Sequence, residues 1–171
     1  MNLAKYPYNI YKINELIEKE NSFIGKYFLS IDLFDSIIKT LSFIALSFNN
    51  TEDKFIESKD NLKKLKKLFS TKIRAILGLS SITKLLNKLE LVKNLLSQNE
   101  LIELQDEEYY KIQYTKLSKY LEEIISNLEI FDKYQIIIPY KINTSSKKVS
   151  FITFTGKPVI EKIDYFEDIK L

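Results

Sequence analysis

The sequence predicts an α+β fold that is mainly helical: an antiparallel helical bundle followed by a C-terminal β-hairpin or small meander. Apolar residues recur every three or four positions through most of the first 133 residues, which is the spacing of amphipathic helices. From Tyr134 onward, β-branched and aromatic residues alternate with polar ones at the period of strands. We therefore expect a helical bundle with an N-terminal arm at 1–133, and a β-rich appendage at 134–171 that packs on the same domain.

The helical part begins with a tyrosine-rich lead, which Pro7 marks as extended, and a short helix within the first 24 residues. The strongest pattern predicts a helix from about Gly25 to Phe48, closed by two asparagines. Further helices are expected from Glu52 or Asp60 to Leu77, over 82–96 and over 108–128. In the last of these we expect Ile112 and Leu117 to face inward.

The strand-like part consists of two runs, YQIIIPYKI and VSFITFT, with the polar segment NTSSKK at 143–148 between them. This arrangement predicts a hairpin, and PVIEKIDYF is a candidate third strand. Pro139 lies inside the first run. Because proline has no amide hydrogen to donate, we expect a solvent-facing edge or a bulge there.

Composition limits the chemistry. The chain has neither histidine nor cysteine, so it lacks the usual general base, the commonest metal ligand and any thiolate nucleophile. Catalysis would have to rest on carboxylates, lysines, hydroxyls or the single arginine, as in carboxylate-pair glycosidases or magnesium-dependent enzymes. We expect no enzymatic activity, no catalytic residue, no cofactor and no metal.

Two acidic segments are the remaining candidates for chemistry. ELQDEEYY holds Glu103, Asp106, Glu107 and Glu108, which would splay around a helix axis and not converge; a solvated connection or helix N-terminus explains them. Asp168-Ile169-Lys170 resembles the end of magnesium-dependent nuclease motifs, but the upstream acid is not evident and a charged tail explains it as well.

The composition also bears on location. The lack of cysteine and of a signal-peptide pattern at the start predicts a cytoplasmic protein. The most apolar window, FDSIIKTLSFIALSF at 34–48, carries Asp35 and Lys39. It is too short and too charged to span a bilayer, so we expect a core helix and no membrane span.

The stretch NLKKLKKLFSTKIRAIL at 61–77 is the most basic part of the chain. Its leucines and isoleucines share one helical face, and its basic residues are Lys63, Lys64, Lys66, Lys67, Lys72 and Arg74. They are candidates for contacts with nucleic-acid phosphates, an anionic membrane or an acidic protein. The simplest interpretation is a core-facing helix with a solvated lysine side, since the net charge is only +3 and A/T-rich codons alone enrich lysine.

The edge of the first strand is a candidate for pairing with a partner strand, in a homodimer or with a larger protein. The residues concerned are Tyr134, Ile136, Ile138 and Tyr140. Tyrosines of the N-terminal lead, Tyr6, Tyr8 and Tyr11, could stack on bases. More often such residues pack on the domain as an anchoring arm.

The long helix with LFDSIIKTLSFIALSF, followed by basic and leucine-rich helices, resembles over 25–128 the helical core of the HEPN superfamily of prokaryotic defence and toxin proteins. Ribonucleases of that superfamily carry an Arg-x4–6-His motif. Here the only arginine is Arg74, and the corresponding positions, Leu79 to Ser81, hold no histidine. The resemblance therefore implies a member without this ribonuclease activity, which acts as a binding or assembly domain.

Together these observations predict a non-enzymatic protein–protein interaction or assembly module, and the resemblance implies a regulatory or adaptor part of a prokaryotic defence system. A protein partner or a homo-oligomer is expected. The alternative is RNA or DNA binding through the basic amphipathic helix.

Overall fold

The structure, a computed structural model, describes residues 5–49, 62, 65, 66, 69, 82–99, 106–128, 130–133, 136–143, 148–156 and 160–163. The chain divides into two compact units. The larger unit runs from Ile13 to Ile130, and the smaller one joins Met1–Lys12 to Phe131–Leu171. These units differ from the predicted ranges 1–133 and 134–171, because the N-terminal residues group with the C-terminal segment.

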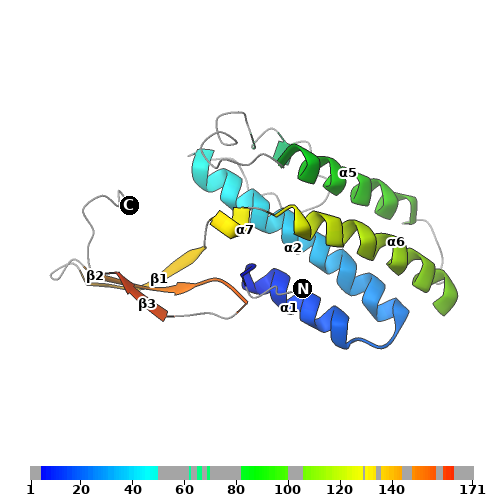
Figure 1. Cartoon of the computed structure of the whole chain (residues 1–171), viewed down its shortest axis with the longest axis horizontal. Coiled ribbons are helices and arrows are strands. Elements are labelled where there is room, and N and C mark those ends of the chain that lie inside the picture. Colours follow the sequence, from blue (N-terminus) through cyan, green and yellow to red (C-terminus); the bar gives the residue numbers. More distant parts are fainter. Residues whose placement is uncertain are drawn as a thin grey trace. The chain divides into compact units, whose positions relative to one another are not determined.

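The helices agree closely with the apolar periodicity. They are α1 (Tyr8–Lys19), α2 (Phe23–Asn49), α5 (Ile82–Asn99), α6 (Glu107–Ser126) and the short α7 (Ile130–Lys133) (Figure 1). Within the residues described, none of these helices combines the length and the apolar character needed to cross a membrane.

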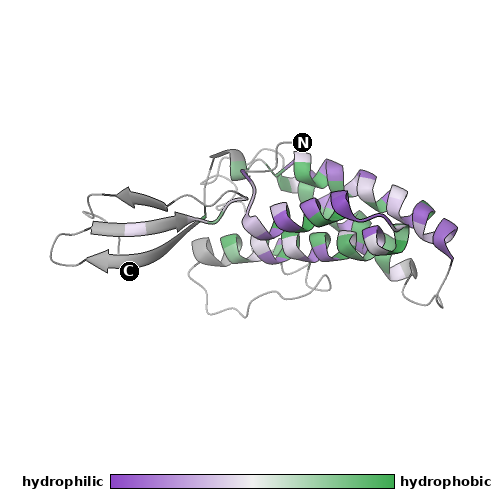
Figure 2. Ribbon diagram, turned by 90° about the horizontal axis from the view of Figure 1, so that it is seen from below, coloured by the Kyte–Doolittle hydropathy of each residue, from purple (hydrophilic) through white to green (hydrophobic). Residues whose placement is uncertain are grey.

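The core of the larger unit lies between α2, α5 and α6. Each helix turns one apolar side inward and a hydrophilic side outward, so green and purple residues alternate around each ribbon in Figure 2. Buried residues include Leu33, Phe34, Ile37, Ile38 and Leu41 from α2, Leu85, Leu86, Leu89 and Val92 from α5, and Leu117, Leu121, Ile124 and Ile125 from α6. Leu62, Leu65 and Phe69 are also buried, which confirms the predicted apolar face of the basic stretch at these positions.

The direction of the helices corrects the prediction of an antiparallel bundle. α2 and α6 run in the same direction, whereas α5 runs opposite to both (Figure 1). The contacts agree, since the first residue of α2, Phe23, meets the first residue of α6, Glu107, and Tyr27 meets Tyr110. The chain runs back along α5 before α6 begins, so α2 and α6 are parallel neighbours. The spacing of apolar residues does not predict the direction in which neighbouring helices run.

The predicted α+β class is wrong for the body that holds the core. The long helices described in that unit are α2, α5, α6 and most of α1, and no strand lies among its described residues. The helices bury their apolar sides against one another, so this core closes without a sheet layer. In the residues that the structure describes, the larger unit is therefore all-α.

The smaller unit contains the strands β1 (Ile137–Asn143), β2 (Lys148–Thr153) and β3 (Ile160–Ile163), paired antiparallel in the order β1-β2-β3. The register of β1 against β2 shifts between Pro139 and Lys141, at the residue that cannot donate to the ladder.

The N-terminal lead is an anchoring arm within this smaller unit. Tyr6 is buried and meets Phe131 edge-to-face, with ring centroids 5.9 Å apart. The Gly156 amide donates to the Tyr6 carbonyl oxygen at 2.9 Å, and the Tyr11 ring lies directly against Gly156. Tyr8 keeps a partly exposed ring, tilted against Phe154. Tyr6 is thus unavailable for stacking on bases.

Candidate functional site

The basic stretch is not brought together as a site by the residues that the structure describes. Of its six basic residues, Lys66 is described, and Lys63, Lys64, Lys67, Lys72 and Arg74 lie outside the described residues. Lys66 is partly buried and forms an ion pair with Glu90 of α5. The Lys66 ammonium group is therefore paired with a carboxylate of the same chain.

The predicted strand-edge residues are only partly described. Ile138 and Tyr140 lie in β1, where Ile138 is opposite Ile152 and Tyr140 falls at the register shift. Ile136 precedes the strand, and its carbonyl oxygen accepts from the Phe154 amide at 2.7 Å. Tyr134 lies outside the described residues.

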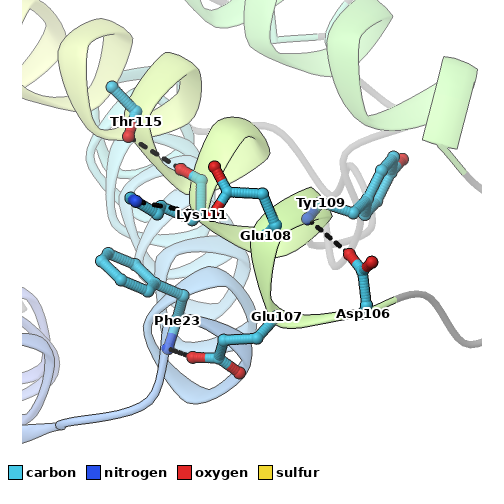
Figure 3. Close-up of polar contacts among 7 residues, drawn as sticks. All are labelled: Phe23, Asp106, Glu107, Glu108, Tyr109, Lys111 and Thr115. Carbon is cyan, nitrogen blue, oxygen red and sulfur yellow. Dashed lines mark hydrogen bonds and ion pairs between the residues drawn. The ribbon is translucent and has the colours of Figure 1, made fainter.

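Three residues of the acidic segment ELQDEEYY make polar contacts where α2 and α6 begin (Figure 3). Asp106 is the N-cap of α6 and accepts from the Tyr109 amide at 2.9 Å. Glu107 accepts from the Phe23 amide, at the start of α2, at 2.6 Å, and Glu108 pairs with Lys111 at 3.4 Å. In the described part of the chain, no three acidic residues are grouped to hold a metal ion. Glu103 and Asp168 to Lys170 lie outside it.

What the structure does bring together is a set of rings where α2 and α6 begin. We use the name aromatic cluster for six residues: Phe23, Tyr27, Phe28, Tyr109, Tyr110 and Tyr114. Centroid distances are 5.5 Å for Tyr27–Phe28, Tyr27–Tyr110 and Tyr109–Tyr110, 5.9 Å for Phe28–Tyr110 and 6.1 Å for Phe23–Tyr114. These are the separations of edge-to-face and tilted ring pairs.

Phe28 is the exposed member of the aromatic cluster. Its side chain is 50% exposed, whereas Tyr27 and Tyr110, which it contacts, are 6% and 7% exposed. A half-exposed phenylalanine thus stands on a base of two buried rings. Contacts with two buried rings therefore restrict the Phe28 ring although half of its surface is exposed.

Two lysines lie at the other end of the cluster. The Lys26 ammonium is 5.5 Å from the Phe23 centroid and 5.9 Å from that of Tyr114, and the Lys111 ammonium is 5.9 Å from the Phe23 centroid. Both are within the range of cation–π attraction. We call the Phe23 and Tyr114 rings, over which the lysines lie, the Phe23 end of the cluster, and the half-exposed Phe28 ring its exposed end.

Two tyrosines of the cluster, Tyr109 and Tyr114, have a raised pKa. Desolvation raises the pKa of Tyr109, with a further contribution from Tyr27 and Tyr110. Desolvation also raises the pKa of Tyr114, and the carboxylates of Glu122 and Glu18 add to the effect. The hydroxyl groups of Tyr109 and Tyr114 therefore keep their proton at neutral pH and can donate hydrogen bonds.

Sequence reasoning did not identify the aromatic cluster, and it placed Ile112 on the wrong side of α6. Ile112 is 46% exposed, because it lies five positions before buried Leu117, well off the inward face. Tyr110 lies seven positions before Leu117 and is in phase with it. The adjacent pairs Tyr27-Phe28 and Tyr109-Tyr110 were the available signal, but their proximity depends on how α2 and α6 pack.

Comparison of the chain with family models, curated proteins and solved structures gave no match. The site must therefore be judged on its own geometry.

Proposed function

We propose that this chain is a non-enzymatic protein-interaction module whose docking surface is the exposed end of the aromatic cluster. The observation that carries this proposal is Phe28, half exposed on the buried rings of Tyr27 and Tyr110. Aromatic side chains are enriched at protein interfaces and among the residues that contribute most to binding.

The rigidity of this surface favours binding. Ordering a free side chain at an interface costs about 0.5–1.5 kcal/mol, and the ring contacts of Phe28 already restrict its motion. Tyr109 is partly buried and contacts Tyr110, one of the two rings that support Phe28. A surface with an apolar centre and polar edges is typical of protein–protein contacts.

The charges near the cluster support a protein partner more than a nucleic acid. Binding to phosphates needs several lysines or arginines with their charge available. Here Lys111 pairs with Glu108, and Lys26 interacts with the carboxylate of Glu20. Nucleic-acid binding through the basic stretch, and a cytoplasmic location, remain predictions from the sequence.

Site-specific photo-crosslinking in cells of the source organism tests the proposal. A photoreactive phenylalanine analogue is placed in the full chain instead of Phe28 or, as the matched control, instead of Phe43. Phe43 lies on the same helix, is 52% exposed and is about 22 Å away along the axis. We expect a defined protein to be crosslinked from the first position and not from the second.

The crosslinked protein is then identified by mass spectrometry and its complex is reconstituted from purified components. Phe28→Ala should weaken this complex by about tenfold or more, as expected for a central aromatic contact, and Phe43→Ala by less than about twofold. Crosslinks to nucleic acid from the Phe28 position, equal crosslinking from both positions, or no crosslink would contradict the proposal.

A further inference from the structure

The charged groups around the aromatic cluster are predominantly acidic. Asp32 is exposed and lies one helical turn after Phe28 on α2, within side-chain reach. Asp106, Glu107 and Glu108 are exposed at the start of α6, where Asp106 and Glu107 accept from backbone amides and Glu108 pairs with Lys111. We call these four residues the acidic rim.

Other charges near the cluster add to this excess. Desolvation raises the pKa of the Tyr114 hydroxyl most, and the negative charges of Glu122 and Glu18 raise it further. The two lysines that lie over the rings, Lys26 and Lys111, are at the Phe23 end. The chain as a whole has a net charge of +3, whereas the groups named here are six carboxylates and two lysines. This surface disfavours phosphates and favours cations.

We infer that the partner docks through a basic protein segment that places an arginine or lysine side chain over the exposed Phe28 ring and pairs its other cations with the acidic rim. This inference rests on the proposed function and adds the chemistry of the partner. Arginine suits the surface best, because its planar guanidinium stacks on rings and pairs with carboxylates at the same time.

The ring and the rim contribute differently to such a complex. Stacking on a pre-ordered ring acts at short range and slows dissociation, whereas the exposed carboxylates act mainly through attraction at a distance. Charge interactions at exposed sites are screened beyond about 8 Å at physiological ionic strength. The affinity should therefore fall as salt is added, without disappearing.

The test is a titration of the full chain with a short peptide of alternating arginine and glycine, with the glutamate–glycine peptide as its counterpart. Binding is followed by fluorescence anisotropy of the labelled peptide and by amide chemical shifts. We expect the basic peptide alone to bind, with the largest shifts at Phe28, Tyr109 and Tyr110. An added single-stranded oligonucleotide should cause no shifts at these residues.

Matched charge variants separate a local effect from net charge. Asp32→Asn with Glu108→Gln removes two carboxylates of the acidic rim. Glu90→Gln with Glu123→Gln removes two carboxylates that pair with Lys66 and Lys88 elsewhere on the helical unit. At low salt the first double variant should lose about tenfold in peptide affinity, and the second less than about twofold.

Equal losses in the two double variants, binding of the acidic peptide, or shifts away from Phe28 would overturn the inference. The crosslinked protein gives a separate criterion. If its complex depends on Phe28 but is unaffected by salt and by the Asp32→Asn/Glu108→Gln variant, the inference is wrong and the proposed function stands. If its complex does not depend on Phe28, the proposed function itself is wrong.

Discussion

Phe28 shows how one residue can be exposed and still held in place. Its ring contacts Tyr27 and Tyr110. The loss of these ring contacts in a Phe28→Ala variant should lower the free energy of unfolding by about 0.5–1.5 kcal/mol. A fully buried ring such as Phe34 would cost about 3–5 kcal/mol when truncated to alanine. Loss of binding in the Phe28→Ala variant can therefore be separated from loss of folding.

At the same scale, Gly156→Ala should destabilise the smaller unit. An added methyl group would meet ring atoms of Tyr11, and relieving that overlap costs about 1–3 kcal/mol. Hydrogen exchange of the Phe154 and Gly156 amides, which are bonded to Ile136 and Tyr6, would report the opening.

Gly25→Ala is the control for this substitution. Its added methyl group would meet the end of the Glu20 side chain, with the nearest atom at 2.6 Å, and that side chain can turn away. Replacing glycine inside a helix also gains up to about 1 kcal/mol in helix propensity. Equal exchange rates of the Phe154 and Gly156 amides in both variants and the wild type would show that Tyr11 does not restrict this position.

At the scale of the helices, the start of α2 is fixed by three side chains. Ser22 accepts from the Gly25 amide at 2.9 Å, Glu20 accepts from the Asn21 and Ser22 amides at 2.8 and 2.9 Å, and Glu107 accepts from the Phe23 amide. The first two are local caps, whereas Glu107 comes from α6. This bond joins the starts of the two parallel helices that carry the aromatic cluster.

Glu107→Ala should therefore lower the free energy of unfolding by about 0.5–2 kcal/mol, the range for loss of a helix cap. Glu122→Ala, at an exposed position of the same helix, should change it by less than about 0.5 kcal/mol. Urea denaturation followed by circular dichroism measures both. Similar values for the two variants would mean that the Glu107 bond does not contribute to stability.

The caps also predict a pH dependence. Hydrogen bonds from the Ser22 and Asn21 amides lower the pKa of Glu20 below 4.5. A lowered pKa in the folded state means that the stabilisation is fully present above 4.5 and is lost as the pH falls through the folded-state pKa. The free energy of unfolding of Glu20→Gln should approach that of the wild type in acid. A constant difference across this pH range would argue against the assignment.

At the scale of the whole molecule, the apolar period predicted the helices well. The helix expected over 25–48 is α2 (Phe23–Asn49), and that over 108–128 is α6 (Glu107–Ser126). Their relative direction was not predictable, because periodicity gives faces and not neighbours. The grouping of residues 1–12 with the C-terminal segment depends on contacts such as Tyr6 with Phe131, between residues far apart in the sequence.

The candidate site was less predictable than the helices for the same reason. Sequence reasoning selected contiguous stretches, the lysines of 61–77 and the residues around Tyr134. The aromatic cluster instead combines residues about 80 positions apart, and each of its pairs alone is ordinary for an amphipathic helix. Only the parallel packing of α2 on α6 makes Phe28 an exposed ring on a buried base.

The most direct test of the central claim is photo-crosslinking in cells from the Phe28 position, compared with the Phe43 position. The account predicts one defined protein crosslinked from Phe28 and none from Phe43, and a reconstituted complex that Phe28→Ala weakens. Crosslinking to RNA or DNA from Phe28, or no difference between the two positions, would contradict it.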